Sequence, residues 1–287
     1  MKPISFQILG VGCWGPGFEN WPELRSLLSF PDKPENKPSE IDETNEDALK
    51  KLSRGPKPEV IPANERRRAP LPVRLAVESS WQATQNAQLD PAHLPCVFVS
   101  GIGDTQLTDY MCKALASENK ALSPTKFHNS VHNAAAGYWT ISTGCMQAAN
   151  SIAGFQESVS LALMEAIMQC ELENRPILLT FYDAPSSEVL KELLKTETPF
   201  SASIIIAPAN SELEKTSYAA SIADGSVDWP SIATSAELEA CYETNPASRI
   251  LPLLAAIAQE NVQSVGDICM PISSERHLKI SPMAANS

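Results

Sequence analysis

Residues 123–170 decide the fold, and they read SPTKFHNSVHNAAAGYWTISTGCMQAANSIAGFQESVSLALMEAIMQC. Within them, 134–143 is rich in small residues and predicts a helix, 148–153 predicts a short strand, and 156–170 predicts a strongly apolar helix. A small-residue turn, AGFQES at 153–158, joins the strand to the second helix. This arrangement is a usual place for a nucleophile, because the unpaired N–H groups and positive potential of a helix N-terminus depress a thiol pKa.

The turn itself offers no group suited to nucleophilic attack. It contains no cysteine, and Ser158 has no evident base beside it in the sequence. Gln156 can donate and accept hydrogen bonds, but its amide is not a nucleophile. Taken alone, Gln156 is an ordinary residue at the start of a helix.

Apolar runs predict further strands and helices on both sides of this stretch. Strands are expected at 4–11, 96–100, 175–182 and 201–207, with a terminal strand at 274–280. Helices are expected at 21–30, at 71–88, from a cap at Asp104 to 116, and at 246–260. The alternation of strands and helices predicts an α/β layered fold with a largely parallel central sheet.

Two polar stretches are expected to contribute little regular structure. Residues 31–62 are rich in Pro, Lys and Glu and predict a long surface loop with a short helix near 46–52. Residues 211–245 are polar and are expected to be loop-like.

The composition argues against nucleic acid and membrane as partners. The chain has 287 residues and a formal net charge of -12, whereas phosphate contacts need clustered Lys and Arg. The one basic cluster, Arg66-Arg67-Arg68, is interpreted as a solvated loop or helix start, with a docking point for an acidic partner as the alternative. No stretch approaches the roughly 20 apolar residues that span a bilayer.

The cysteines indicate a reducing compartment. The sequence has seven, without a C-x-x-C pair, and several lie inside apolar runs, such as Cys96 in LPCVFVSG. Reduced, buried thiols of this kind are typical of a cytoplasmic protein. The apolar stretch at 1–12 is short and contains Gln7, so it is predicted to be a first strand and not a signal peptide.

His128 and His132 lie four residues apart, which on a helix would place both on one face. That spacing suits a metal pair, but zinc normally needs a third protein ligand and Pro124 favours a loop at the start of the segment. The alternatives are histidines hydrogen-bonded within a buried loop or lying at a subunit interface, and no metal or cofactor is expected. Asp183 follows a predicted buried strand, where it is a carboxylate at the strand's end or a cap of the next turn.

The motif S-P-T-x-F-H-N-S-V-H-N-A-A-A-G-Y-W at 123–139 resembles the β-ketoacyl synthases of the thiolase-like fold. Within that family it is most similar to the short chain-length-factor-like proteins of aryl polyene clusters. Counting along the chain without gaps places Gln156 at the synthases' nucleophilic cysteine, a replacement for which chain length factors are known. The resemblance implies a synthase N-terminal-like domain at 1–210, followed by a C-terminal extension at 211–287 packed on the same domain.

The resemblance also implies a function without catalysis. A chain length factor would form a heterodimer with a full-length β-ketoacyl synthase and shape its acyl tunnel, and the acyl carrier protein would be reached indirectly through the synthase. The residues expected at the tunnel or interface are Thr105, Gln106, Tyr110, Phe127, His128, His132, Asn133, Phe155 and Gln156. The alternatives are a malonyl-carrier-protein decarboxylase, with Gln156 as an oxyanion donor, and a stand-alone small-molecule binder. The family's H-G-T-G-T motif is not visible, and beyond Gln156 only His277 remains.

Overall fold

The computed structural model describes residues 2–29, 52–209, 216–232, 234–259 and 266–283. Its strands form one eight-stranded sheet in the order β3-β2-β4-β5-β1-β6-β8-β7. The strands are β1 (Ile4–Trp14), β2 (Cys96–Val99), β3 (Ala149–Ile152), β4 (Ile177–Asp183), β5 (Phe200–Pro208), β6 (Ser217–Asp224), β7 (Ile268–Pro271) and β8 (Arg276–Pro282).

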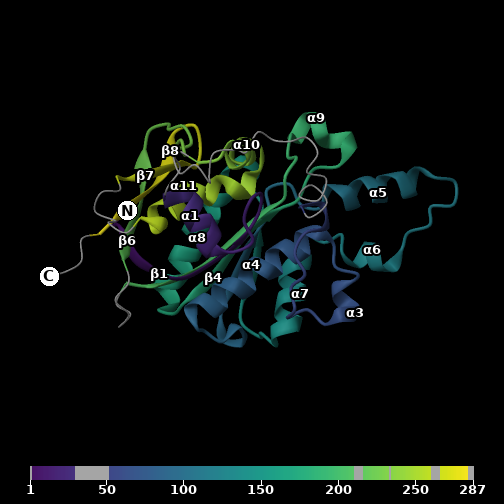
Figure 1. Cartoon of the computed structure of the whole chain (residues 1–287), viewed down its shortest axis with the longest axis horizontal. Coiled ribbons are helices and arrows are strands. Elements are labelled where there is room, and N and C mark those ends of the chain that lie inside the picture. The colour runs from purple at the N-terminus through teal and green to yellow at the C-terminus, as the bar shows by residue number, and fades with distance from the viewer. Residues whose placement is uncertain (1, 30–51, 210–215, 233, 260–265, 284–287) are drawn as a thin grey trace.

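The helices lie on both faces of this sheet (Figure 1). The α-helices are α1 (Trp21–Ser29), α3 (Ala63–Arg66), α4 (Leu71–Ala87), α5 (Thr105–Ala116), α6 (Pro124–His128), α7 (Ala134–Thr143), α8 (Ser158–Glu173), α9 (Lys191–Leu194), α10 (Ala236–Thr244) and α11 (Leu251–Ala258). Short 3₁₀ turns are η1 (Pro91–His93), η2 (Phe155–Glu157), η3 (Glu188–Leu190) and η4 (Pro246–Ile250). Among the described residues, no helix is long and apolar enough to cross a bilayer.

The sheet is mixed, as the sequence predicts, but its parallel part is smaller than expected. β2 pairs in parallel with β3 and β4. The other five pairings, from β4–β5 across to β7–β8, are antiparallel. The expectation of a largely parallel sheet therefore holds only for the β3-β2-β4 end.

Alternating side chains of the central strands build a core on each face of the sheet. On β4, Leu179 and Phe181 join the core under α8 and α11, whereas Leu178 and Tyr182 join the core under α4 and α7. Strand side chains point alternately to opposite faces, so a strand that is apolar throughout is buried on both sides. This explains why 175–182 is a continuous apolar run in the sequence, and it confirms the layered α/β arrangement.

Two glycines let α4 lie directly on β1. A Cβ at Gly10 would stand 2.4 Å from the carbonyl oxygen of Ala83, and one at Gly12 would stand 2.2 Å from that of Ser79. Behind this contact, a buried chain of hydroxyl groups joins α4 to β4 and β5, with Thr180 bonded to both Ser80 (2.7 Å) and Ser203 (2.9 Å). Because each hydroxyl has a partner, the close approach leaves these buried polar groups satisfied.

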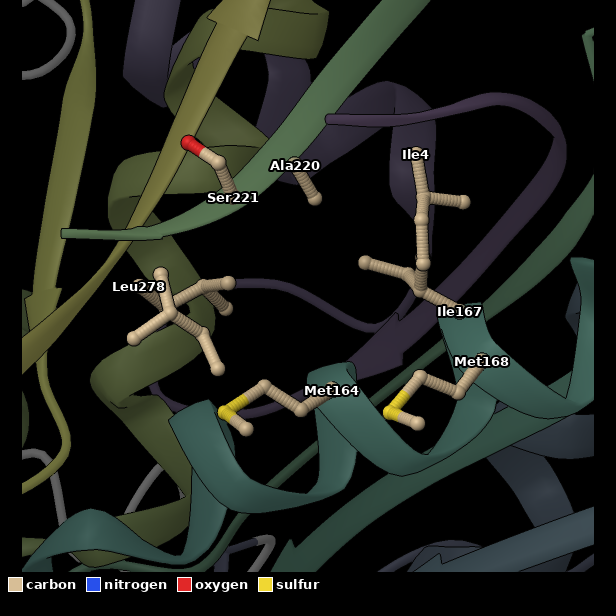
Figure 2. Close-up of a pocket in the computed structure, with 8 residues that line it drawn as sticks. Ile4, Met164, Ile167, Met168, Ala220, Ser221 and Leu278 are labelled. Carbon is tan, nitrogen blue, oxygen red and sulfur yellow. The ribbon is translucent and has the colours of Figure 1, made fainter. Parts of the chain in front are cut away.

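The C-terminal part of the chain continues the sheet. The expectation of a loop-like 211–245 is wrong, since β6 occupies 217–224 and α10 occupies 236–244. The β6 segment SYAASIAD has too few bulky apolar residues to give a clear strand pattern. Where β6 and β8 approach α8, Met164 and Met168 face Ala220 and Leu278 across a small apolar hollow (Figure 2).

The predicted surface loop at 31–62 is only partly described. Residues 30–51 lie outside the described residues, and with them all but Leu52 of the short helix expected near 46–52. The described end of the stretch is not wholly at the surface, because Ile61 is completely buried in the core beneath α4. Ile61, with Leu52 and Val60 packed against the same core, therefore ties the described end of this polar segment to the domain.

Candidate functional site

The site lies at the carboxyl ends of the three parallel strands. β3 leads into the turn at 153–157, β2 leads into the loop at 100–104, and β4 ends at Asp183. Strands that run in parallel present these ends at one edge of the sheet, which is where ligand and catalytic groups of α/β proteins commonly gather. Here the edge brings together segments that are far apart in the sequence.

The turn after β3 holds Phe155 and Gln156 ahead of helix α8. Both belong to the 3₁₀ turn η2, and α8 begins at Ser158, so Gln156 precedes the helix that the sequence predicts to start with it. Phe155 has φ +51°, a left-handed conformation that costs energy in a non-glycine residue. Its side chain is 44% exposed, whereas Gln156 is half-buried. Strain of this kind, with an aromatic ring left in solvent, marks the turn as the centre of the candidate site.

No nucleophile is available in this turn. The Ser158 hydroxyl is buried, accepts a hydrogen bond from the Gly154 N–H (2.9 Å) and donates one to the Phe155 carbonyl (2.8 Å). Both bonds hold the backbone of the turn in shape. Ser158 is therefore a structural cap, and Gln156 supplies only an amide.

Asp183 organises the neighbouring loop. Its carboxylate is fully buried and accepts hydrogen bonds from the Ser100 hydroxyl (2.6 Å), the Gly101 N–H (3.1 Å) and the Ile102 N–H (3.2 Å). The Ser100 hydroxyl oxygen in turn accepts from the Gly103 N–H (2.9 Å). Burial raises the pKa of the Asp183 carboxyl to about 6, against the lowering effect of these donors. The sequence placed Asp183 at the strand's end but gave no sign that it binds the loop of another strand.

The loop, the turn and the C-terminal part of the chain meet at Gly101. A Cβ there would lie 2.6 Å from Cβ of Pro246 in η4 and 2.9 Å from the Phe155 carbonyl oxygen. Asn245, just before η4, donates through Nδ2 to the Asp183 carbonyl (3.2 Å). η4 is therefore a part of the site that sequence reasoning missed, since 246–260 reads only as an apolar helix.

Residues 104–133 form a projection that we call the arm, and α5 and α6 stand away from the body in Figure 1. Asp104 caps α5 by accepting from the Leu107 N–H (2.9 Å), which confirms the predicted cap. Thr105 is buried and accepts a hydrogen bond from the Ser187 N–H (2.8 Å). Gln106 donates to the Ser186 carbonyl (3.2 Å). Both predicted site residues thus anchor the base of the arm to the segment after β4.

Tyr110 joins the two helices of the arm. Its hydroxyl accepts from the Ser123 N–H (3.2 Å), and the Lys126 ammonium lies 3.5 Å from the centre of its ring. Phe127, one residue further along α6, leaves 59% of its side chain exposed. Among the described residues, the arm therefore presents one largely exposed aromatic ring, that of Phe127.

The histidine pair does not share a helix. α6 ends at His128 and α7 begins at Ala134, so His132 lies in the connection between them. His128, His132 and Asn133 are all exposed, and the expectation of a buried histidine loop is wrong. Among the residues that the structure describes, no group of three His, Cys, Asp or Glu side chains is arranged to hold a metal ion.

Asn129, between the two histidines, is the buried residue of this connection. Its Nδ2 donates to the Arg68 carbonyl (3.1 Å), and its Oδ1 accepts from the Tyr138 hydroxyl (3.2 Å). Asn129 was not among the predicted site residues, although it stands inside the motif that carries the family resemblance. It fixes the end of the arm that leads into α7 to the backbone of Arg68, in the basic cluster at 66–68.

Comparison with known proteins decides the family. The family model of the β-ketoacyl synthase N-terminal domain matches residues 40–250, well over half of the chain. The chain belongs to the β-ketoacyl synthase family. The match to this family extends to residue 250. From the sequence, the synthase-like domain is expected to end at 210. A comparison with curated proteins finds no match.

Solved structures of the same fold confirm the thiolase-like class of this β-ketoacyl synthase relative. One is the ketosynthase ApeO in complex with its chain length factor ApeC from Xenorhabdus doucetiae (18% identity, TM-score 0.67, 97% of this chain and 99% of that chain covered). Another is the ishigamide ketosynthase/chain length factor (13%, 0.64, 99% and 100%). A third is the type II polyketide synthase complex AntDE:AntF, of an acyl-carrier protein with its ketosynthase (13%, 0.68, 99% and 100%).

Proposed function

We propose that this chain is a non-catalytic chain length factor, which pairs with a full-length β-ketoacyl synthase and shapes its acyl tunnel. The observation that carries the proposal is the turn after β3. There Gln156 stands where the resemblance places the family's cysteine, and the hydroxyl of Ser158 is already used in two backbone hydrogen bonds. An amide cannot form the acyl-enzyme intermediate that condensation needs. Bond formation would then belong to the partner.

The open edge of the sheet supports a partner on the side of β3. β3 is the last strand in the sheet order, and Ala149 and Asn150 on it are exposed. Nearby in the chain, Ile141 is 82% exposed and Met146 is 92% exposed. An edge strand has unpaired N–H and C=O groups that accept another strand, and exposed apolar side chains beside it favour a protein interface. The partner synthase would cover this edge.

The tunnel-shaping groups would come from the turn and the arm. The exposed ring of Phe155, beside Gln156, would face the partner's tunnel, with Tyr110 of the arm behind it. Thr105 and Gln106, which anchor the base of the arm, would act on the tunnel through its position. Phe127, His128, His132 and Asn133 would lie at the interface with the partner. The length and residue sequence of the motif at 123–139 favour a product of the aryl polyene type.

The acyl carrier protein would dock mainly on the synthase. Carrier proteins are typically acidic, and a net charge of -12 on this chain disfavours encounter with such a partner. Arg66 also donates to the Pro58 carbonyl (3.1 Å), Arg67 donates to Asn64 (2.7 Å) and Arg68 pairs with Glu65 (3.8 Å), so all three clustered arginines already make contacts within the chain. Replacing all three by Ala should leave the affinity of the heterodimer for the carrier nearly unchanged. A large loss of carrier binding by an intact heterodimer would refute this part of the proposal.

The cellular setting proposed is the cytoplasm, where the synthase and carrier would also be found. All seven cysteines are free thiols, and five of them are buried. Reduced thiols in this number suit a reducing compartment.

The decisive experiment is co-purification of this chain with a full-length β-ketoacyl synthase from the same organism. A stable complex is expected for the unchanged chain, and Met146→Asp should weaken it by placing a charge beside the β3 edge. The matched control is Met283→Asp, because Met283 follows β8 near the far end of the sheet. Equal binding by both variants would place the interface elsewhere, and no complex with the unchanged chain would refute the proposal.

A malonyl-carrier assay on the purified chain separates the alternative function. Release of CO₂ without any synthase present would support a priming decarboxylase with Gln156 as oxyanion donor. The one histidine beyond Gln156, His277, lies on β8 and bonds to the Gly225 carbonyl (2.9 Å). β8 is far from β3 in the sheet order, so His277 does not support decarboxylation at the turn.

A further inference from the structure

Two distant segments of the chain converge on Asp183. Its carboxylate holds the 100–102 backbone and the Ser100 hydroxyl, and its carbonyl oxygen accepts from Asn245 at the start of η4. The partners of the carboxylate are hydrogen-bond donors, and hydrogen bonds to an ionised acceptor are among the stronger ones. The loop is thus bound to the end of β4 by a single side chain.

The position of this loop sets the base of α5, which is one of the two ends by which the arm is held; Asn129 holds the other end. Gly103 is held through Ser100, and α5 begins two residues later at Thr105. The ties from α5 to the body that the structure records are at its base, at Thr105 and Gln106. α5 has 12 residues, and at 1.5 Å per residue it is about 18 Å long, so a tilt of about 10° at its base would move its far end by about 3 Å.

The same loop also bears on the turn that holds Phe155. Gly101 fits against the Phe155 carbonyl oxygen with no room for a side chain. A displaced loop would therefore move the exposed ring of Phe155 and the base of α5 together. No other described side chain has recorded hydrogen bonds to both Gly101 and Ile102.

We propose that Asp183 is a positioning residue, which fixes the arm and the Phe155 turn relative to each other and so sets the shape of the partner-facing surface. That this surface faces a partner rests on the proposed function. The positioning itself is a property of this chain and can be measured without a synthase. Asp183 is buried and would not itself touch the partner. It would nevertheless control the position of the arm and of the Phe155 turn, which would.

Cys112 gives a natural site for a spectroscopic test. It is the exposed cysteine on α5, whereas five of the other cysteines are buried and Cys269 is half-buried. A nitroxide on Cys112, in a Cys269→Ser background, reports on the motion of the arm. Asp183→Ala is compared with Thr180→Ala, which also truncates a fully buried, hydrogen-bonded side chain of β4 but does not touch the loop.

Asp183→Ala should increase the nitroxide mobility and raise amide hydrogen exchange at 101–103 by more than tenfold. Thr180→Ala should change neither measurement locally, even where it destabilises the whole chain. If both variants give the same nitroxide spectrum and the same exchange at 101–103, the proposal is overturned. Should Asp183→Ala fail to fold, Ser100→Ala decides, because it removes the hydroxyl that links Asp183 to Gly103; an unchanged spectrum there would also overturn it. Failure to bind a synthase leaves all these outcomes unaffected.

Discussion

Replacing Asp183 by Asn should remove a specific dependence of stability on pH. The folded pKa of about 6 lies above the ordinary value of 3.8, so between these values the folded state binds a proton more tightly than the unfolded state. The stability that this group contributes is complete below the unfolded pKa and is lost as the pH rises through the folded pKa. Asparagine has the same shape and does not titrate, so the difference between the two proteins isolates the carboxylate.

The expected size follows from those two pKa values. Between pH 5.5 and pH 7.5, the free energy of unfolding of the unchanged protein, minus that of Asp183→Asn, should fall by about 1 kcal/mol. With a urea m-value of roughly 3 kcal/mol/M, this corresponds to about 0.3 M in the difference between the two midpoints. Urea titrations of both proteins at the two pH values measure it.

The control is Asp267→Asn, at an exposed position. Hydrogen bonds from Lys279 and Ser281 lower the pKa of Asp267, so it stays ionised in both states throughout this pH window. Its stability difference from the unchanged protein should therefore not change between pH 5.5 and pH 7.5. The difference in free energy of unfolding between the unchanged protein and Asp183→Asn could instead stay constant or grow as the pH rises. That result would show that the loop's hydrogen-bond donors affect the pKa of Asp183 more than burial does, and it would refute the reasoning.

Four further outcomes are expected. Gly12→Ala should destabilise the fold by about 3 kcal/mol or more, because the new Cβ would meet the Ser79 carbonyl oxygen at 2.2 Å. Denaturant midpoints measure this, and unchanged stability would contradict the α4–β1 contact. Gln156→Cys should not restore condensation of malonyl-carrier by the chain alone, as product analysis would show. Tyr110→Ala should shift the product length distribution of the heterodimer without stopping turnover; an unchanged distribution would remove Tyr110 from the tunnel. Cys112 should react with a maleimide well before the buried cysteines do, and mass spectrometry of partly labelled protein would reveal any other order.

The sequence predicts those elements whose apolar pattern is set by the core. The runs at 96–100 and 134–143 correspond closely to β2 and α7, because strands buried on both faces and helices of small residues leave clear patterns. β6 and β7 were missed. β7 has only four residues, and β6 mixes small and polar side chains at partly exposed positions. Neither carries enough apolar periodicity to be separated from a loop.

The connections within the candidate site could not be predicted from the sequence. Family resemblance pointed to Gln156 and the turn, and the structure brings that turn beside the 100–104 loop. Nothing in the sequence shows that Asp183 binds Ser100 or that Pro246 closes on Gly101, since these contacts join segments that are far apart in the chain. The histidine pair misled because a four-residue spacing has meaning only on a continuous helix, and the helix ends at His128.

The position of β1 in the sheet affects how the chain can fold while it is being translated. β1 leaves the ribosome before the other seven strands that the structure describes, yet it lies between β5 and β6, with Phe6 opposite both Pro208 and Tyr218. Its apolar residues must therefore wait, without either neighbouring strand, until most of the chain has been synthesised. Sheets that depend on such distant pairings fold slowly and expose aggregation-prone strands in the meantime. Shortening the chain before β6 would leave this strand open on one side permanently, so the yield of folded protein should depend on the C-terminal segment as strongly as on the family's own motif.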